Sequence, residues 1–225
     1  MAEVALITGA KRGLGAALYR VFHEHDFNCI LNCRHADDCE FSDLASEHTY
    51  HICGDLCDQW IINRLGHIAR EKGVKVLINN AGIYSSDRLV NMTEREFRHV
   101  QEVNLVAPVL LTRAVWPVLQ ETGGIVVNIN SIAGLQGGNK ELAYCASKHG
   151  LAGFSRALQF DATDDGVRVL NVYLGAMNTD MMKGRSKEPE KLIDPNEAAK
   201  VIYDLCRNYD TLRITEATIL RRQYS

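Results

Sequence analysis

The sequence predicts an α/β fold in which a parallel sheet of about seven strands carries helices on both faces. Short apolar runs alternate along the chain with stretches of helical periodicity, an order typical of strand–helix–strand units. The first run, Val4–Thr8, is nearly uninterrupted, as expected of a strand covered on both faces. A glycine-rich turn and a helical pattern follow it directly. We therefore expect one doubly wound domain over residues 1–225.

The remaining elements follow from the same patterns. Strands are expected at Val4–Thr8, Asn28–Asn32, Tyr50–Cys53, Val76–Ile78, Ile125–Asn130, Val167–Leu174 and within Arg213–Leu220. Helices are expected over Ala16–His25, Ser42–Glu47, Asp58–Lys72, Thr93 to about Leu119, Tyr144–Phe160 and Pro195–Arg207. Pro108 and Pro117 predict bends or a break in the fourth of these helices. The charged stretch Lys183–Lys191 predicts a mobile flap.

Composition narrows the class of protein. The 225 residues are 46% hydrophobic and 24% charged, which suits one globular domain with a substantial core. A net charge of -3 gives no support to nucleic-acid binding. No apolar run approaches the roughly 20 residues of a membrane span, and the first residues lack the pattern of a signal peptide. We therefore expect a cytoplasmic protein that does not bind membranes.

The seven cysteines raise the question of a metal. Cys29/Cys33 and Cys53/Cys57 are each separated by three residues, unlike the two of a common zinc knuckle, although His48 and His51 lie nearby. Small buried thiols are ordinary in apolar strands, and a reducing compartment keeps them reduced. We favour thiols and predict no metal.

The glycine turn points to a phosphate ligand. Between the first strand and the first helix lie Gly9, Lys11, Arg12, Gly13, Leu14 and Gly15. In a βαβ unit such glycines permit a tight turn and bring a pyrophosphate close to the backbone and to the positive end of the helix. A plain glycine turn is the alternative; its position after a first strand favours a dinucleotide-binding Rossmann fold.

The residue type at the end of the second strand should determine whether NAD or NADP is bound. An acid there binds the ribose 2′-hydroxyl of NAD, whereas an arginine suits the 2′-phosphate of NADP. The expected position holds Cys33, and Arg34 follows it. Together with Arg12, Arg34 would clamp a phosphate. The alternative is that both arginines are solvated and Asp37 or Asp38 binds the ribose. We favour NADP(H).

Two further segments follow strand ends. Asp55 and Leu56 follow the third strand, where a carboxylate would bond an adenine amino group; a turn or helix cap explains Asp55 equally well. Asn80, Ala81 and Gly82 follow the fourth, where small residues let the backbone approach a ligand.

The segment from Ser131 to Lys148 carries the chemistry. On a helix, Lys148 lies one turn after Tyr144 on the same face. A nearby ammonium favours the phenolate and lowers the pKa of the tyrosine from about 10. Ser131, at the end of a strand, could bond the same reacting oxygen. A buried tyrosine beside a solvated lysine is the alternative for such a pair taken alone. Asn104 lies among apolar neighbours and needs hydrogen-bond partners of its own.

Taken together, the chain resembles the classical short-chain dehydrogenases/reductases over essentially its whole length. The ordered motifs are Thr8-Gly9-(x)3-Gly13-x-Gly15, Asn79-Asn80-Ala81-Gly82, Asn104, Ser131 and Tyr144-(x)3-Lys148. The resemblance implies that Tyr144 exchanges the substrate proton and that Ser131 positions the carbonyl oxygen. It implies that Lys148 lowers the Tyr144 pKa and bonds the nicotinamide ribose, and that Asn104 holds a water linking Lys148 to solvent.

The chain also departs from this family. Leu174-Gly175 replaces the usual Pro-Gly, while Thr179 still matches the position that bonds the nicotinamide amide. The C-terminus lacks the glycine pair common near the end of family members, a region that often helps to build their tetramer. By resemblance we still expect a homo-oligomer, a dimer or tetramer. The implied function is that of an NADP(H)-dependent oxidoreductase acting on a carbonyl or secondary alcohol, closest to 3-oxoacyl-carrier-protein reductases and working as a reductase. The alternative is a catalytically silent NADP(H)-binding sensor or scaffold.

Overall fold

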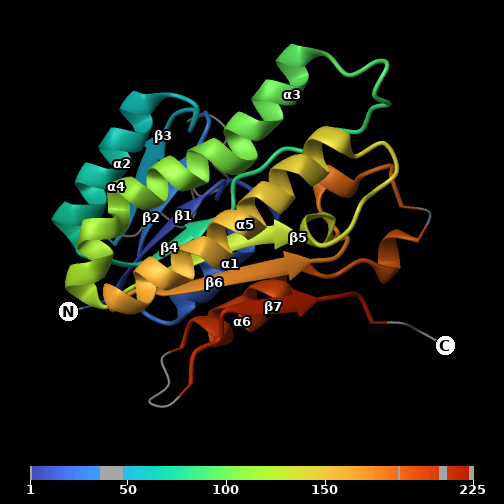
Figure 1. Cartoon of the computed structure of the whole chain (residues 1–225). Coiled ribbons are helices and arrows are strands. Elements are labelled where there is room, and N and C mark those ends of the chain that lie inside the picture. Colours follow the sequence, from blue (N-terminus) through green and yellow to red (C-terminus); the bar gives the residue numbers. More distant parts are fainter. Residues whose placement is uncertain (1, 36–47, 187, 208–211, 223–225) are drawn as a thin grey trace.

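The computed structural model describes residues 2–35, 48–186, 188–207 and 212–222. Its seven strands form one parallel sheet in the order β3-β2-β1-β4-β5-β6-β7 (Figure 1). The predicted doubly wound parallel sheet is therefore confirmed. The helix expected at Ser42–Glu47 and the alternative ribose ligands Asp37 and Asp38 lie outside the described residues.

The strands and helices alternate along the chain as the apolar patterns predict. The strands are β1 Val4–Thr8, β2 Asn28–Cys33, β3 Thr49–Cys53, β4 Val74–Asn79, β5 Ile125–Ser131, β6 Arg168–Leu174 and β7 Glu216–Ile219. The α-helices are α1 Gly13–Glu24, α2 Gln59–Lys72, α3 Glu94–Gln101, α4 Ala107–Thr122, α5 Leu142–Asp164 and α6 Pro195–Cys206. The shorter helices are a π-helical turn at Glu102–Val106 and 3-10 turns at Ile132–Gly134, Asp180–Met182 and Pro189–Lys191.

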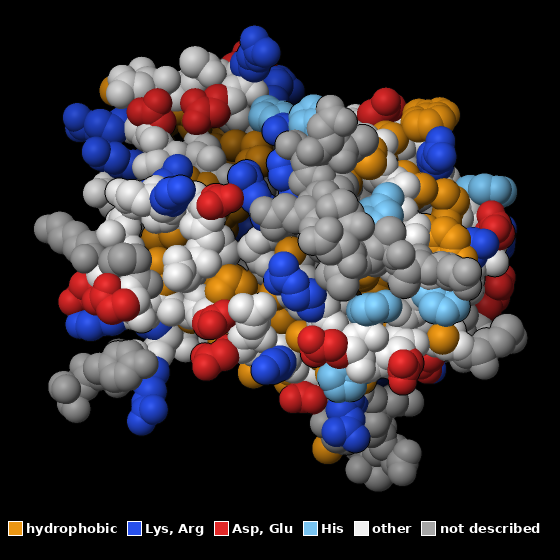
Figure 2. Space-filling model, turned by 180° about the vertical axis from the view of Figure 1, so that it is seen from behind, with side chains coloured by type: hydrophobic (Ala, Val, Ile, Leu, Met, Phe, Trp, Pro, Cys, Tyr) orange, Lys and Arg blue, Asp and Glu red, His pale blue; other side chains and the backbone are white. Residues whose placement is uncertain are grey.

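Apolar side chains are buried on both faces of the sheet. One cluster joins α1 and α6 to the sheet and contains the buried residues Phe22 and Ile202. The other joins α2, α4 and α5 to the opposite face and contains Leu65 and Leu111. Burial of these two layers is the main source of stability for such a sandwich. Seen from behind, acidic and basic side chains are interspersed over the surface (Figure 2).

The helix after Thr93 differs from its prediction. The Thr93 hydroxyl accepts a hydrogen bond from the Glu96 backbone N–H at 3.1 Å and begins α3. Bends or a break are predicted at the prolines, and the structure contradicts the break: α3 continues through the π-helical turn into α4, with Pro108 in the first turn of α4 and Pro117 inside it. The wider π turn lets the chain stay helical where it meets the first proline.

One helical stretch has the length of a membrane span. Glu94–Thr122 is long and apolar enough to cross a bilayer by length and composition alone, a property that the core helices of soluble proteins share. In this fold Leu111, Val115 and Leu119, which belong to α4 within this stretch, are buried in the core.

The topology fixes where a ligand can bind. From β1 the chain passes to β2 on one side, and β4 lies on the other side of β1, so the strand order reverses between β1 and β4. Ligands of open α/β sheets bind beyond the carboxyl ends of the strands at this reversal.

Candidate active site

A cleft of about 790 Å³ opens at the carboxyl ends of the strands, at the reversal between β1 and β4. All the predicted cofactor residues line it: Gly9, Lys11, Arg12, Gly13, Leu14, Gly15, Arg34, Asp55, Leu56, Asn80, Ala81, Gly82, Tyr144, Lys148 and Thr179. Ser131 lines it as well, whereas Asn104 is buried behind it. The fold thus brings together residues that lie up to 170 positions apart along the chain.

The glycine turn is compact because its glycines carry no side chains. Gly9 and Gly13 adopt left-handed φ angles of 63° and 55°. A Cβ on Gly15 would lie 2.2 Å from the Gly9 carbonyl oxygen, and one on Gly13 would lie 3.1 Å from Thr179 Cγ2. Helix α1 begins here and its N-cap residue, Arg12, makes no capping bond with its side chain. The first N–H groups of α1 are therefore available to an anion in the cleft.

Asn80 ties this turn to the end of β4. Its side-chain amide donates to the carbonyl oxygens of Thr8 at 2.8 Å and Gly9 at 3.1 Å. In return, the Thr8 hydroxyl accepts from the backbone N–H groups of Asn80 and Ala81, both at 3.0 Å. These bonds hold the floor of the cleft at the point where β1 and β4 separate.

The two arginines line the cleft in different settings. Arg12 Nη1 pairs with Asp180 Oδ2 at 3.0 Å, across the mouth of the cleft, and both side chains are exposed. Arg34 is also exposed, and its charge helps to lower the pKa of Asp55. The chief cause of that lowered pKa is the hydrogen bond that the Cys57 backbone N–H donates to Asp55 Oδ1 at 2.9 Å. Asp55 therefore holds its own turn while it lines the cleft.

Tyr144 and Lys148 lie one turn apart on α5 and are both buried. Burial raises the pKa of Tyr144 to about 12, outweighing a hydrogen bond with Ser131 that lowers it. Burial also lowers the pKa of Lys148 to about 8. The expectation that the ammonium brings the phenol pKa below 10 is wrong for the protein alone. Lys148 Nζ donates to the Ile129 carbonyl oxygen at 2.9 Å and lies 5.9 Å from the Tyr144 ring centroid, so desolvation dominates.

Asn104 lies in the π-helical turn and uses its whole side chain to hold the neighbouring loop. Its amide donates to the Ile83 carbonyl oxygen at 2.8 Å and to Ser147 Oγ at 3.1 Å, and its carbonyl oxygen accepts from the Ile83 N–H at 2.8 Å. Ser147 belongs to the same turn of α5 as Lys148, so Asn104 links the π turn to the helix that carries the candidate catalytic pair.

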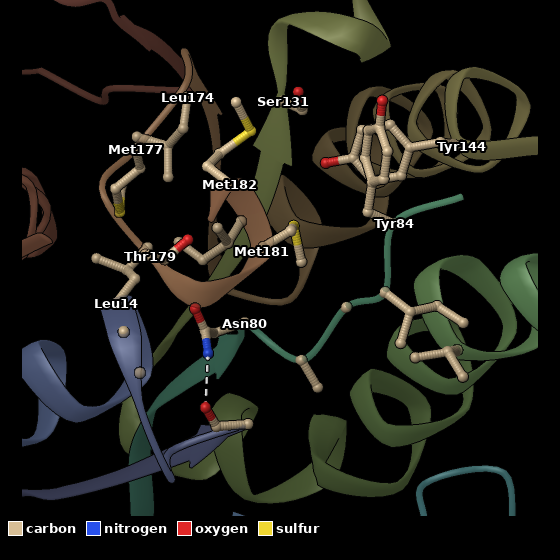
Figure 3. A pocket seen from close by; sticks show the side chains of 18 of the residues that line it. Leu14, Asn80, Tyr84, Ser131, Tyr144, Leu174, Met177, Thr179, Met181 and Met182 are labelled. Carbon is tan, nitrogen blue, oxygen red and sulfur yellow. Dashed lines mark hydrogen bonds between the residues drawn. The ribbon is translucent and has the colours of Figure 1, made fainter. Parts of the chain in front are cut away.

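The remaining part of the cleft has an aromatic wall and a thioether wall. The rings of Tyr84 and Tyr144 lie 5.1 Å apart, and Met177, Met181 and Met182 gather opposite them (Figure 3).

Two charged residues contact this aromatic wall, and the sequence motifs predict a role for neither of them. Tyr84 donates its hydroxyl hydrogen to Glu141 Oε1 at 2.7 Å, and the Arg185 guanidinium carbon lies 3.9 Å from the Tyr84 ring centroid. Glu141 could have been found, because it precedes Tyr144 by three positions and such residues share a helix face. No sequence signal marks Arg185, which reaches the cleft only through the path of the loop after β6.

The cysteines raised by the metal hypothesis lie on neighbouring strands. Cys33 and Cys53 are paired in register between β2 and β3, with their sulfur atoms 3.7 Å apart. Among residues 2–35, 48–186, 188–207 and 212–222, no three His, Cys, Asp or Glu side chains gather as metal ligands do. Leu174, at the departure from Pro-Gly, ends β6, and the next N–H, from Gly175, donates to the Ile219 carbonyl oxygen at 2.9 Å.

Proteins of known name are similar to this chain in sequence. Residues 3–190 match the family model described as short chain dehydrogenase. The 3-oxoacyl-[acyl-carrier-protein] reductase FabG of Rickettsia prowazekii is 30% identical over 195 residues, covering 85% of this chain and 80% of its own. Protein FixR of Bradyrhizobium diazoefficiens is 31% identical, covering 91% of this chain and 80% of its own.

Solved structures have the same fold. A short-chain dehydrogenase from Streptomyces avermitilis, 28% identical, superimposes with a TM-score of 0.84 over 97% of this chain and 89% of its own. An alcohol dehydrogenase from Thermococcus sibiricus, 24% identical, gives a TM-score of 0.89 over the full length of both chains. By its family model, its relatives and its fold, the chain belongs to the short-chain dehydrogenase family of oxidoreductases.

Proposed function

We propose that this protein is an NADP(H)-dependent oxidoreductase that interconverts a carbonyl and a secondary alcohol, acting as a reductase. One observation carries the proposal: Ser131, Tyr144 and Lys148 line the same cleft as the glycine turn at the start of α1. A proton donor thus lies beside a site suited to a dinucleotide. The 3-oxoacyl-carrier-protein reductases among its relatives support reduction of the carbonyl as the direction of the reaction.

The cleft fits a dinucleotide by its own chemistry. The glycine turn has no room for side chains and presents the uncapped start of α1, as a pyrophosphate requires. The end of β2 carries Cys33 in place of an acid, and Arg12 and Arg34 supply two guanidinium groups for a 2′-phosphate. Related folds are known with NADP bound, in ElxO and in a short chain dehydrogenase of Burkholderia cenocepacia, each 24% identical to this chain.

In this reaction Ser131 and Tyr144 would each act on the substrate oxygen. When bound, the nicotinamide supplies or accepts a hydride. Ser131 donates a hydrogen bond to the carbonyl oxygen, and Tyr144 gives that oxygen a proton as the alcohol forms. Because its pKa is raised to about 12, Tyr144 is protonated at neutral pH, which is the state that reduction needs.

Lys148 would act from behind Tyr144. With its pKa lowered to about 8, it keeps its charge at neutral pH and can stabilise the phenolate left after proton transfer. It would also bond the nicotinamide ribose, as in the family. A water held at the π turn near Asn104 would pass a proton from solvent through Lys148 to the phenolate, so that Tyr144 is protonated again and Lys148 ends with its charge unchanged. Thr179, whose methyl group lies close to Gly13, would meet the nicotinamide amide, as in the family.

The experiment that tests this proposal compares NADPH with NADH. Binding of each is measured by titration of the purified protein, with Arg34→Asp alongside, followed by turnover against a panel of carbonyl compounds. We expect NADPH to bind more tightly than NADH, and Arg34→Asp to abolish this preference. Equal or tighter binding of NADH would show that the arginines are solvated, and would redirect the search to alcohols with NAD.

A further inference from the structure

The aromatic wall of the cleft carries a cation at its outer end. The guanidinium of Arg185 lies against the Tyr84 ring, with its central carbon 3.9 Å from the ring centroid. The Tyr84 ring in turn lies 5.1 Å from the Tyr144 ring. All three residues line the cleft, and Arg185 is exposed to its opening. A positive charge is therefore separated from the candidate proton donor, Tyr144, by one ring, that of Tyr84.

This way of holding an arginine leaves its hydrogen-bond donors free. A guanidinium lying against a ring is attracted through its flat face, whereas its N–H groups point outward in its plane. Those donors match the two oxygens of a carboxylate. In the part of the chain that the structure describes, no carboxylate lies within ion-pair distance of Arg185.

The neighbouring charges do not neutralise it. Asp180, on the same loop, is already paired with Arg12 at 3.0 Å. Glu141 lies at the hydroxyl end of Tyr84, where it accepts the phenol hydrogen at 2.7 Å, rather than over the ring. Lys183 also lines the cleft and adds a second positive charge to the loop.

We propose that Arg185 is a specificity-determining residue that selects carbonyl substrates carrying a carboxylate a few bonds from the reacting carbon. This inference rests on the proposed function and names its substrate class. The substrate body would lie between Tyr84 and the wall formed by Met177, Met181 and Met182, where flexible thioethers suit an apolar or aromatic body.

The test uses two aldehydes that differ only in charge, 4-carboxybenzaldehyde and methyl 4-formylbenzoate, each with NADPH. We expect the wild-type protein to have the lower KM for the carboxylate. Arg185→Ala should raise that KM by roughly 10-fold to 100-fold, the range for a lost hydrogen bond to a charged group, and should move the ester KM much less. Arg185→Lys, which keeps the charge but not the planar fork, should fall between the two.

Two matched variants separate a specific contact from a general field. Lys183→Ala removes the other cation of the loop and should change the carboxylate KM by only a few-fold, because it makes no stacked contact with Tyr84. Glu141→Gln removes the nearby negative charge and should lower the carboxylate KM. Equal effects of Arg185→Ala on the acid and the ester would overturn the inference, and so would equal KM values for both aldehydes in the wild type.

The outcome also separates this inference from the proposed function. If the ester and the acid are reduced with equal KM values, the protein is a reductase and Arg185 does not select carboxylates. If neither aldehyde is reduced, isothermal titration of the NADPH complex with 4-carboxybenzoate decides: binding lost in Arg185→Ala upholds the carboxylate site, and no binding overturns it. Failure of NADPH itself to bind would instead contradict the proposed function.

Discussion

Lys148 and Tyr144 occupy the same face of α5, yet in the protein alone the lysine bonds a strand and not the tyrosine. Its ammonium donates to the Ile129 carbonyl oxygen at 2.9 Å and lies 5.9 Å from the Tyr144 ring centroid. Burial shifts the two groups in opposite directions, raising the pKa of the phenol to about 12 and lowering that of the ammonium to about 8. Both shifts favour the neutral forms, so the pair meets its substrate with the proton on the tyrosine.

The buried charge of Lys148 should cost stability. Below its folded pKa of about 8 the lysine is charged in both the folded and unfolded states, and the lowered pKa then costs about 3 kcal/mol of folding free energy. Lys148→Met should therefore stabilise the protein by up to about 3 kcal/mol at pH 7. The gain should shrink as the pH rises from 8 to 10.5, because the lysine then becomes neutral in both states.

Urea unfolding of both proteins at pH 7 and at pH 10 measures this difference. Lys200→Met, an exposed change on α6, is the control and should leave the free energy of unfolding almost unchanged. A Lys148→Met protein that is less stable than the wild type at pH 7 would show that the bond to Ile129 outweighs the cost of burial.

If the protein is a reductase, the same lysine should set the pH dependence of reduction. If a charged Lys148 is needed, kcat/KM for NADPH, which reports the free enzyme, should fall as the pH rises through about 8. The Tyr144 phenol should add no step in this range, because its pKa is about 12. Initial rates at saturating carbonyl substrate between pH 6 and pH 10 measure the profile. A flat profile up to pH 10 would contradict the role of Lys148.

The ion pair between Arg12 and Asp180 should compete with the cofactor. Both side chains are exposed, so the pair contributes at most about 1 kcal/mol. Asp180→Asn should free Arg12 for the 2′-phosphate and tighten NADPH binding by up to about fivefold, with no effect on NADH. Fluorescence titration of both nucleotides gives the affinities. In an Arg12→Ala background the same change should have no effect, and an equal gain there would rule out this competition.

The glycine turn should tolerate no added methyl group at Gly15. An alanine there would bring its Cβ to 2.2 Å from the Gly9 carbonyl oxygen and 2.9 Å from Ala10 Cα, both backbone atoms that cannot yield cheaply. We expect Gly15→Ala to destabilise the fold by about 1–3 kcal/mol and to abolish NADPH binding.

Gly153→Ala on α5 is the matched control for this substitution. Nothing lies within 4 Å of its added Cβ, so the change should stabilise the helix by about 0.5–1 kcal/mol. Thermal unfolding compares the two variants. An unchanged melting temperature and unchanged NADPH binding in Gly15→Ala would contradict the close-packed turn.

The sequence predicts those elements that are determined by residues close together along the chain. Apolar runs place the strands, and the glycines after β1 predict the turn because a side chain at Gly9 or Gly15 would meet neighbouring backbone atoms. The spacing of Tyr144 and Lys148 places them on one face because four residues make about one helical turn. The chain stays helical at Pro108 against expectation because a π turn precedes it, and nothing in the local sequence announces that turn.

The rest depends on contacts between distant segments. Arg185 reaches Tyr84 only because the loop after β6 folds back over the cleft, and Asp180 reaches Arg12 for the same reason. The spacing of Tyr144 and Lys148 predicts a lowered pKa for Tyr144, and this prediction is wrong. Spacing indicates the neighbouring charge but not the burial of the phenol. Desolvation belongs to the whole fold, and here it outweighs the charge.

The measurement that tests the central claim most directly is NADPH oxidation by the wild type and by Tyr144→Phe across a carbonyl panel, with NADPH binding measured on both. We expect the wild type to turn over at least one carbonyl, and Tyr144→Phe to lose about 100-fold to 10,000-fold in kcat while it still binds NADPH. Undiminished turnover in Tyr144→Phe would contradict the assigned proton donor. Tight NADPH binding by the wild type without turnover of any carbonyl would instead indicate a sensor.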